Sequence, residues 1–400
     1  MSADSPGADT DVLVIGAGVY GCATAYFLAR FGGDVTVVDA GDIGAEASGA
    51  NAGNLHLQIS PFSHADKNDA WIADFARSLP FFVDALALWK RLEGELDCDI
   101  ELRCPGGIMV AETERQLQVL HDKVALERSH GLPIEMIGAA ELRRRAPYVA
   151  DRVLGASYCP DEGMANALLV VTGLADGARK AGARFVLNAP VERMEQDARG
   201  WRVDTRRGSI GCRRVVIAAG SSSDKVASMA GVRLPLGHRV IQMVATEPCE
   251  PFVEHLLYHA ETRLTLKQVA NGNVLIGGGW TASRDAVFGR PAVLSDSLRG
   301  SLALARRIVP RLAAISVIRA WAGPNIYTPD GRPILGALAG CPGLFAAVCN
   351  TYGFTLGPLC GLLVAELIAG RPMSFDLASF SPSRFATSMN ATIDGPADAS

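Results

Sequence analysis

The sequence has no run of apolar residues long enough to cross a membrane. The most apolar segment, residues 356–369, is shorter than the roughly 20 residues that a spanning helix needs, and it contains Glu366. The first ten residues are acidic and polar, unlike a secretory signal. We therefore expect a buried helix over 356–369, flexible tails at 1–9 and 386–400, and a location that is cytoplasmic or peripheral at the inner membrane.

Paired cysteines and an excess of basic charge are also absent. The nine cysteines are an odd number and include no C-x-x-C pair. This pattern argues against a disulfide framework or a zinc site and favours reduced thiols, so no metal site is predicted. A formal net charge of −4 gives no electrostatic footprint for nucleic acid.

What the chain does contain is a glycine-rich motif in a βαβ context. An apolar strand pattern over 11–15 breaks at Gly16-Ala17-Gly18-Val19-Tyr20-Gly21 and continues as an alanine-rich helix through Arg30. A second apolar run over 34–38 ends at Asp39. G-x-G-x-x-G with a strand before it, a helix after it and a terminal acid predicts a dinucleotide site.

Each chemical feature of this motif has a physical reason. Gly16 permits the tight turn, Gly18 lets a pyrophosphate approach the backbone, and Gly21 lets the helix pack on the strand. The helix N-terminus attracts phosphate through its unpaired N–H groups and its dipole. The Asp39 carboxylate suits a ribose with free hydroxyls and disfavours NADP, which leaves FAD and NAD open at this point.

The rest of the chain predicts an α/β protein with a separate antiparallel sheet. A helix pair over 66–95, interrupted at Pro80, precedes a strand over 106–111. Asn271-Gly272 between two β-rich runs is a strong hairpin signal. Residues 320–336 are rich in turn formers, and a strand over 344–349 leads into the final helix. Gly277 to Ala282 fits a relaxed G-x-G-x-x-A, but no helix pattern follows it, so we expect no second nucleotide site.

Taken together, the motifs resemble a known family, the FAD-dependent D-amino-acid oxidase superfamily. The resemblance covers about residues 10–372, and the chain is similar to the glycine oxidase, sarcosine oxidase and D-amino-acid dehydrogenase branch. It is carried by Ala47-Ser-Gly-Ala-Asn-Ala-Gly53, Trp321-Ala-Gly, Thr328-Pro-Asp-Gly-Arg-Pro-Ile334 and Tyr352-Gly-Phe-Thr355. Leu264 to Gln268 and Ile276 to Trp280 look most like the β-type flavin chains of opine oxidases and hydroxyproline dehydrogenases.

The resemblance implies a Rossmann-like FAD-binding domain with an inserted α+β substrate domain built on an antiparallel sheet. Residues 10–57, 150–232 and 318–372 would form the FAD domain, and 58–149 and 233–317 the substrate domain. It implies noncovalent FAD, because no cysteine lies between Trp321 and Pro333 and the setting of His56 differs from the histidyl-flavin motif. Carried over by motif, the cofactor-binding residues are Gly16, Ala17, Gly18, Tyr20, Gly21, Asp39, Ser48, Asn51, Ala52, Gly53, Val191, Ala219, Gly220, Gly353, Phe354 and Thr355.

One departure from the family pattern affects the substrate. Glycine oxidase-like members carry a carboxylate-binding arginine soon after the Trp-x-Gly segment, where this chain has Asn325. An amide cannot form the bidentate charged pair that a guanidinium forms with a carboxylate. Either another cation replaces it, with Arg239, Arg263 and Lys267 as candidates, or the substrate is not a simple amino acid.

The implied activity is oxidation of an amine or amino acid, such as a secondary amine, a D-amino acid or an opine-like compound. Flavin N5 would take a hydride equivalent from the α C–H, so no acid-base residue is required and none is predicted. The electron acceptor is left open among oxygen, a quinone and a partner subunit, as is assembly into homo- or hetero-oligomers. The predicted substrate-pocket residues are His56, Tyr258, His259, Trp280, Asn325 and Tyr352.

Two other functions stay open from the sequence alone. One is a flavoprotein subunit of a heteromeric dehydrogenase that acts mainly in electron transfer. The other is an NAD-linked hydroxy-acid dehydrogenase, which explains the first fingerprint but gives no role to residues 328–333 and 352–355.

Overall fold

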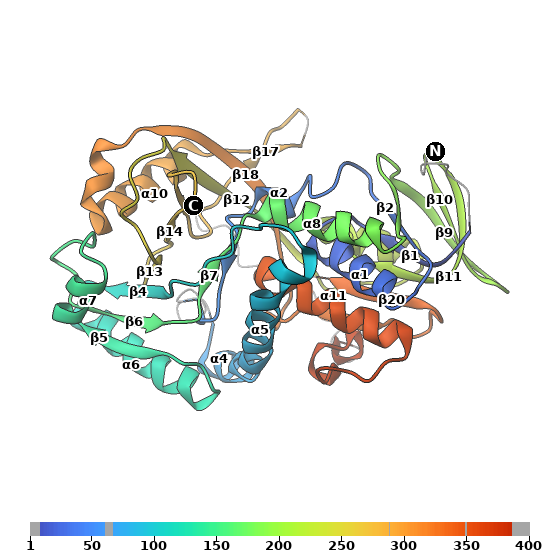
Figure 1. The fold of residues 1–400 in the computed structure, drawn as a ribbon, viewed down its shortest axis with the longest axis horizontal. Coiled ribbons are helices and arrows are strands. Elements are labelled where there is room, and N and C mark those ends of the chain that lie inside the picture. The colour runs from blue at the N-terminus through green and yellow to red at the C-terminus, as the bar shows by residue number, and fades with distance from the viewer. Residues whose placement is uncertain (1–8, 61–66, 288, 349, 386–400) are drawn as a thin grey trace.

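The fold consists of two large sheets side by side, each covered by helices (Figure 1). The structure is a computed structural model that describes residues 9–60, 67–287, 289–348 and 350–385. Except for Asp9, the predicted flexible tails lie outside the described residues. The α/β class expected from the sequence is confirmed.

The first sheet contains the βαβ unit. Its main path runs β19-β20-β11-β1-β2-β8, and β10 and β9 extend it from β11. The pairs among β20, β11, β1, β2 and β8 are parallel. Their apolar sequences fit strands that are covered on both faces. The strands are β1 (Thr10–Ile15), β2 (Val35–Val38), β8 (Arg184–Val186), β9 (Val191–Asp197), β10 (Gly200–Thr205), β11 (Gly208–Ile217), β19 (Ile334–Ala337) and β20 (Leu344–Val348).

Three helices pack at this sheet: α1 (Val19–Arg30), α8 (Ala167–Lys180) and α11 (Gly353–Ala369). α1 and α11, from opposite ends of the sequence, lie side by side (Figure 1). They approach closely because Gly357 and Gly361 have no side chains. A Cβ at Gly361 would lie 2.5 Å from the Ala23 Cβ. The predicted buried helix over 356–369 is confirmed.

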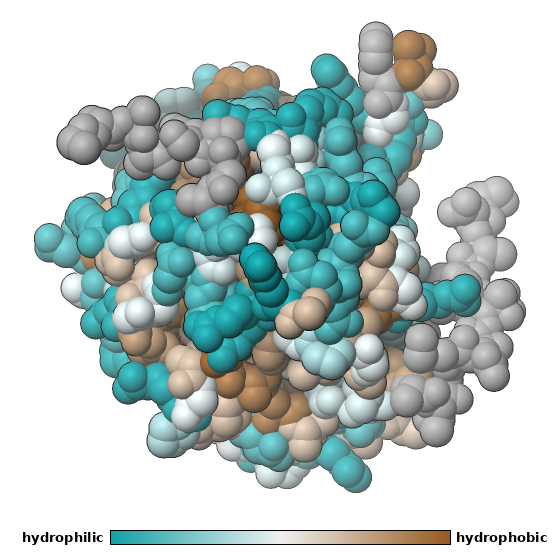
Figure 2. All heavy atoms as spheres, turned by 90° about the vertical axis from the view of Figure 1, so that its right-hand side faces the viewer, coloured by the Kyte–Doolittle hydropathy of each residue, from teal (hydrophilic) through white to brown (hydrophobic). Residues whose placement is uncertain are grey.

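Most apolar side chains are inside the molecule. The face at the outer end of the first sheet is largely hydrophilic, with small apolar patches (Figure 2). Within the described ranges, no helix is both long and apolar enough to span a bilayer.

The second sheet is almost entirely antiparallel, as the sequence predicted. Its order is β18-β12-β15-β14-β13-β4-β6-β5, and only the β13–β4 pair is parallel. The helices α6 (Glu114–Ser129), α7 (Ala139–Arg145) and α10 (Ser295–Ile308) accompany it. Its strands are β4 (Gly107–Ala111), β5 (Glu135–Gly138), β6 (Gly155–Cys159), β12 (Gly237–Thr246), β13 (Leu256–His259), β14 (Thr265–Gln268), β15 (Val274–Gly277) and β18 (Val317–Tyr327).

Several local predictions are confirmed. The helix pair is α4 (Asp69–Ala76) and α5 (Leu79–Leu96), and Pro80 lies in the first turn of α5, where its missing N–H costs nothing. The Asn271-Gly272 turn joins β14 to β15, with Gly272 at φ +88°. The remaining short elements are α2 (Ala47–Ala50), α9 (Ser223–Ser228), β3 (Asn54–Leu55), β7 (Gly163–Met164), β16 (Ser283–Arg284) and β17 (Pro291–Ala292).

The interpretation of residues 320–336 as turn-rich was wrong over its first half. β18 continues as one strand through Gly323 and Pro324 to Tyr327. Pro324 is tolerated because β18 is at the edge of the sheet and pairs only with β12. Glycine is required at position 323 because any side chain would clash with Ala50: a Cβ there would lie 2.7 Å from the Ala50 Cβ.

The second sheet has two different faces, because alternate residues of each strand point to opposite sides. One face packs into an apolar core. Val244, Leu257, Leu266 and Ile276 pack with residues of α10 in one apolar cluster. Alternate residues of a strand point to the opposite face, where a Cβ at Gly277 would meet Met243 Sδ at 2.3 Å. This second face therefore carries Met243, Tyr258, Thr265, Lys267, Trp321 and Asn325, which we call the inner face.

Candidate functional site

The glycine turn after β1 excludes side chains at two positions. Gly16 has φ +113°, and a Cβ there would lie 2.3 Å from the Ala218 oxygen. At Gly21 a Cβ would lie 1.8 Å from the Gly16 oxygen. Both contacts are far shorter than any real Cβ contact, so the turn and the helix packing depend on glycine, as the motif predicts.

Gly18 and Ser48 form the floor of the predicted phosphate site. Gly18 is the N-cap of α1, and the Val19 N–H donates to Ser48 Oγ over 3.0 Å. A Cβ at Gly18 would lie 3.0 Å from the same hydroxyl. Tyr20 is buried inside α1. The helix therefore presents backbone and a hydroxyl, the groups that bind phosphate at helix N-termini.

Asp39 lies at the end of β2 and is only partly buried. Its carboxylate accepts hydrogen bonds from Ala17 N at 2.6 Å and Gly41 N at 2.8 Å. The Ala189 N–H donates to the Asp39 carbonyl oxygen, which brings the chain before Val191 to the same place. Ala219 and Gly220 follow β11, which is the other neighbour of β1. The predicted adenosine residues thus lie around the carboxyl ends of the parallel strands, where such folds bind nucleotides.

The loop from Ala47 to Gly53 is held in shape by Asn51. The amide of Asn51 donates to Ser48 O over 2.6 Å and accepts from Gly53 N over 2.7 Å, across Ala52. Gly53 has φ +68°, and a Cβ there would lie 2.0 Å from the Ala165 oxygen. Trp321 Nε1 donates to Ala50 O over 2.8 Å. This bond fixes the loop to the inner face of the second sheet.

The N-terminus of α11 meets the strand that follows this loop. Thr355 Oγ1 accepts from His56 N at 3.0 Å and donates to Asn54 O at 3.3 Å. The ring of Phe354 packs on Trp89, with centroids 5.1 Å apart, so Phe354 has only its backbone to offer a cofactor. With Gly353 at the first position, this turn is a second helix N-terminus, and it contacts the strand that follows the predicted flavin-binding loop.

His56, Tyr258 and Tyr352 come together although the sequence separates them widely. His56 Nδ1 lies 2.8 Å from the Tyr258 hydroxyl, and the rings of His56 and Tyr352 are 6.0 Å apart. Burial, helped by the charge of Lys267, lowers the pKa of His56 to about 4. His56 is therefore neutral at pH 7. Tyr352 OH accepts from Ser60 N at 3.2 Å, and burial raises the pKa of Tyr352 to about 12.

Lys267 is a buried cation whose charge acts on His56. Its side chain is on the inner face, two residues from Thr265, which pairs with Tyr258. Lys267 is 1% exposed, and its ammonium has no hydrogen-bond partner among the described residues. Burial, together with the charge of Arg103, lowers the pKa of Lys267 to about 7.

Unlike the Lys267 ammonium, the guanidinium groups of Arg239 and Arg263 contact other groups of the protein. The Arg239 guanidinium stacks over the Tyr327 ring at 4.4 Å, and Arg263 Nη1 donates to Gly279 O over 3.4 Å. Asn325 lies on the inner face three strands from β14, and its Oδ1 is buried without a hydrogen-bond partner in the described part of the chain.

Two of the predicted pocket residues lie away from this group. His259 Nε2 lies 3.1 Å from a carboxylate oxygen of Glu112, and its Nδ1 accepts from the N–H groups of Glu261 and Thr262. Trp280 donates to Arg263 O and packs toward Gly300 of α10. The side chains of His259 and Trp280 are therefore both held by contacts within the protein. Those of Trp280 lie on the side of the sheet that faces α10.

A buried polar network behind His56 was not predicted from the sequence. Glu162 and Glu127 are both 0% exposed. Glu162 accepts from Leu57 N, Gln58 N and Gln58 Nε2, at 2.7, 2.9 and 2.8 Å. Lys123 Nζ, 1% exposed, lies 2.7 Å from Glu127 and 3.0 Å from Gln58 Oε1. Glu162 and Gln58 carry no local sequence signal, because they are 104 positions apart in the chain.

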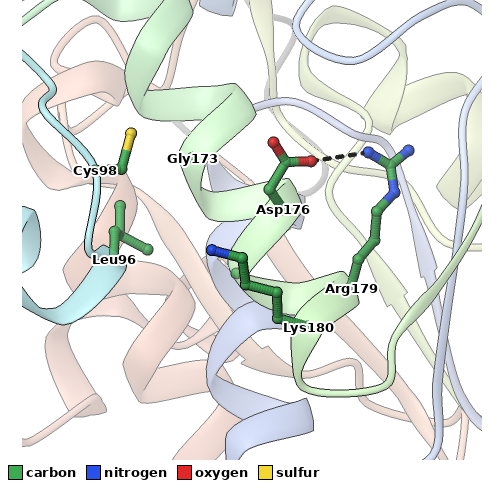
Figure 3. Close-up of a pocket in the computed structure, with 7 residues that line it drawn as sticks. Leu96, Cys98, Gly173, Asp176, Arg179 and Lys180 are labelled. Atoms are coloured by element: carbon green, nitrogen blue, oxygen red, sulfur yellow. Dashed lines mark hydrogen bonds and ion pairs between the residues drawn. The ribbon is translucent and has the colours of Figure 1, made fainter.

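A separate surface hollow of about 390 Å³ lies between the end of α5 and α8 (Figure 3). Asp176 and Arg179 form an ion pair beside it at 3.1 Å. It is lined by Leu96, Cys98, Gly173, Asp176, Gly177, Arg179 and Lys180 and includes no predicted site residue.

Comparison with known proteins agrees with this geometry. The profile of the family described as FAD dependent oxidoreductase (DAO) matches residues 11–367. The chain belongs to the DAO family of FAD-dependent oxidoreductases. Its cofactor is FAD, and the glycine turn, the partly exposed Asp39 carboxylate and the two helix N-termini described above fit that cofactor. The NAD-linked alternative therefore has no support.

Individual relatives of this DAO family member match over nearly their full length. The B chain of opine oxidase from Rhizobium meliloti is 30% identical over 94% of this chain and 98% of that protein. The beta chain of sarcosine oxidase from Rhizobium meliloti is 26% identical over 94% and 88%. The crystal structure of glycine oxidase from Geobacillus kaustophilus superposes with a TM-score of 0.82 at 27% identity, covering 94% of this chain and 99% of that one.

Proposed function

We propose that this protein oxidises an amine that carries a carboxylate, in the class of secondary amines, amino acids and opine-like compounds. The observation that carries the proposal is Lys267, a buried lysine on the inner face whose ammonium has no hydrogen-bond partner among the described residues. An isolated buried ammonium is costly. A substrate carboxylate would supply the missing charge, and the names of the relatives above support the same class of substrate.

FAD, when bound, would supply the redox chemistry by accepting a hydride equivalent from the substrate α C–H, which leaves an iminium ion for water to hydrolyse. Gly16, Gly18 and Gly21 would hold the pyrophosphate, and Asp39 would hold the ribose. Ser48 and the Asn51 loop, with the first turn of α11, would line the flavin; these parts are held together by their own hydrogen bonds. The attachment is noncovalent in this proposal.

The remaining residues orient the substrate. Lys267 binds the carboxylate as a point charge. It takes the role of the bidentate arginine, which this chain lacks because Asn325 stands at that position. His56, Tyr258 and Tyr352 enclose the amine end, and the buried rings around Tyr352 exclude water. The Asn325 amide forms a hydrogen bond to a second polar group of the substrate. An opine-like compound would provide such a group.

A second proposal concerns assembly. Two of the relatives are named as subunits of oxidases, which supports a heteromeric complex in which a partner subunit receives the electrons. Oxygen and a quinone are the alternative acceptors. A cytoplasmic location stays a prediction from the sequence. Measuring whether the isolated, FAD-loaded chain turns over with oxygen, with a quinone, or only after adding a partner separates these cases.

Anaerobic bleaching of the flavin tests the proposed function. The purified protein is mixed without oxygen with sarcosine, D-amino acids, hydroxyprolines and opines, and its visible absorption is followed. We expect one carboxylated class to bleach the oxidised band. Bleaching by none of them, in a sample that holds flavin, would overturn the proposal.

A further inference from the structure

A row of residues on neighbouring strands crosses the inner face of the second sheet. The registers of the β13–β14, β14–β15, β12–β15 and β12–β18 pairs place its members side by side. Directly opposite residues of paired strands lie about 5 Å apart. In order across the sheet, the members of the row are Tyr258, Thr265, Gly277, Met243 and Trp321.

Both ends of this row are attached to elements that we predict to bind the flavin. At one end, Trp321 Nε1 donates to Ala50 O over 2.8 Å. At the other end, the Tyr258 hydroxyl lies 2.8 Å from His56 Nδ1, and His56 N donates to Thr355 Oγ1 in the first turn of α11. The middle of the row therefore lies between the two flavin-binding elements, where the proposed function requires the substrate.

The middle of the row carries no side chain of its own, because it is Gly277. The Met243 side chain lies over it: a Cβ at Gly277 would be 2.3 Å from Met243 Sδ and 2.8 Å from its Cε. The third nearest atom is Thr265 Oγ1, at 3.2 Å. The φ of Gly277 is not positive, so its backbone would accept alanine. Glycine is thus required at position 277 by the Met243 side chain.

Met243 is buried without being part of the apolar core. It is 7% exposed, yet it belongs to none of the apolar clusters formed by the described residues. The next residue, Val244, packs in the cluster that includes α10. Methionine is unbranched and flexible and fills irregular space. Its side chain therefore bounds a space on the inner face.

This space is within reach of a ligand held by Lys267. Thr265 pairs with Gly277, and Lys267 is two residues further along β14 on the same face. Lys267 and Gly277 are therefore diagonal neighbours, about 7 Å apart. A carboxylate bound to Lys267 would leave the next atoms of the substrate to extend over Gly277, toward the Met243 thioether.

We propose that Met243 is a specificity-determining residue, whose side chain limits the size of the substrate group that lies over Gly277. The inference rests on the proposed function and deepens it. With Met243 in place, the space takes a short substituent on the amine or the α-carbon, such as a methyl group. Replacing Met243 with alanine removes Cγ, Sδ and Cε, which opens room for a chain of similar length.

Binding of redox-inert acids tests the assignment without turnover. The full-length flavoprotein is titrated with straight-chain carboxylates from acetate to hexanoate, and the change in its flavin absorption is followed. We expect the affinity of the wild type to fall as the chain lengthens. In Met243→Ala the affinity should instead rise about fourfold per methylene until the space is filled, which is the effect of burying one CH₂ group. The same dependence on chain length in both proteins, or no spectral change with any acid, would overturn the inference.

Gly277→Ala supplies a matched test in two backgrounds. In Met243→Ala, the new methyl group refills part of the space, so the preference for short acids should return. In the wild type, the same methyl group meets Met243, so its effect should differ, as expected for residues in contact. An identical effect in both backgrounds would overturn the inference.

Two further variants guard against effects on folding. Met243→Val leaves a smaller cavity and should shift the preference in the same direction by less, and it decides the question if Met243→Ala does not retain flavin. Met194→Ala removes a buried methionine of the first sheet and should leave the chain-length preference unchanged. A shifted preference in Met194→Ala would show that the effect is not specific to Met243 and would overturn the inference.

Turnover then connects the space to the reaction. Anaerobic flavin reduction is measured with N-methylglycine and N-butylglycine, or with the matching short and long pair for whichever amine reduces the wild type fastest. Met243→Ala should reduce the preference for the short amine roughly 10- to 60-fold. An unchanged ratio would overturn the inference. If the acids bind as expected but no amine reduces the flavin, the proposed function fails and the placement of Met243 stands.

Discussion

Replacing Lys267 with methionine tests the carboxylate anchor directly. Methionine keeps most of the side-chain volume and removes the charge. A hydrogen bond to a charged group contributes about 1.5–3 kcal/mol, so a carboxylated substrate should bind roughly 10- to 150-fold more weakly. The matched control is Lys180→Met, on the exposed side of α8, which should change neither binding nor rate.

The assay is the substrate dependence of anaerobic flavin reduction, with a carboxylated amine and its methyl ester compared in each variant. The ester should lose little on going from wild type to Lys267→Met, because it has no anion to bind. Equal weakening of acid and ester would show that Lys267 only supports the fold. Normal reduction with slowed reoxidation by oxygen would assign the lysine to the second half-reaction and refute the anchor.

pH gives an independent check of the same residue. Burial lowers the pKa of Lys267 to about 7, so the ammonium is present below that pH and is lost as the pH rises through it. Affinity of the wild type for the carboxylated substrate should fall above about pH 7, with the midpoint moved upward in the complex because the bound anion favours the charged lysine. Lys267→Met should lack this decline.

The remaining predictions concern the cofactor. Gly21→Ala places a Cβ 1.8 Å from the Gly16 oxygen and should abolish FAD retention, measured as flavin absorbance per protein, whereas Gly94→Ala, in open space on α5, should leave retention unchanged. Asp39→Asn should weaken FAD binding about tenfold, the value of one charge-assisted hydrogen bond, as measured by titrating the apoprotein; unchanged affinity would remove Asp39 from the ribose site. Acid precipitation should release the flavin into the supernatant, and yellow precipitate would instead show a covalent bond.

The βαβ unit of the cofactor half could be predicted from the sequence because its signals are local. The strand, turn and helix from Asp11 to Arg30 each depend on neighbours within a few residues. The Asn271-Gly272 turn of the second sheet was predicted for the same reason, because it fixes its own hairpin. The strand through Pro324 was misread for the opposite reason. Whether a proline is tolerated depends on the strand being at a sheet edge, which only the assembled sheet determines.

The substrate half depends on pairings between distant residues. His56 and Tyr258 are 202 positions apart, and no pattern in either segment indicates the contact. Tyr258 and His259 were both predicted for the pocket, but neighbours in a strand point to opposite faces. Once β13 is known to be a strand, only one of the two can reach the inner face. Glu162 and Gln58 were missed because a buried polar pair has no sequence signature of its own.

The alternation of side chains along the strands of the second sheet affects how the substrate specificity of this fold can change. Val244 and Leu266 fill the core against α10, and their immediate neighbours Met243 and Lys267 face the inner side. Residues of the inner face and residues of the apolar core thus alternate along the same strands. If the proposed substrate site is right, a library restricted to Met243, Thr265 and Lys267 should change what the enzyme accepts while leaving its apolar core untouched.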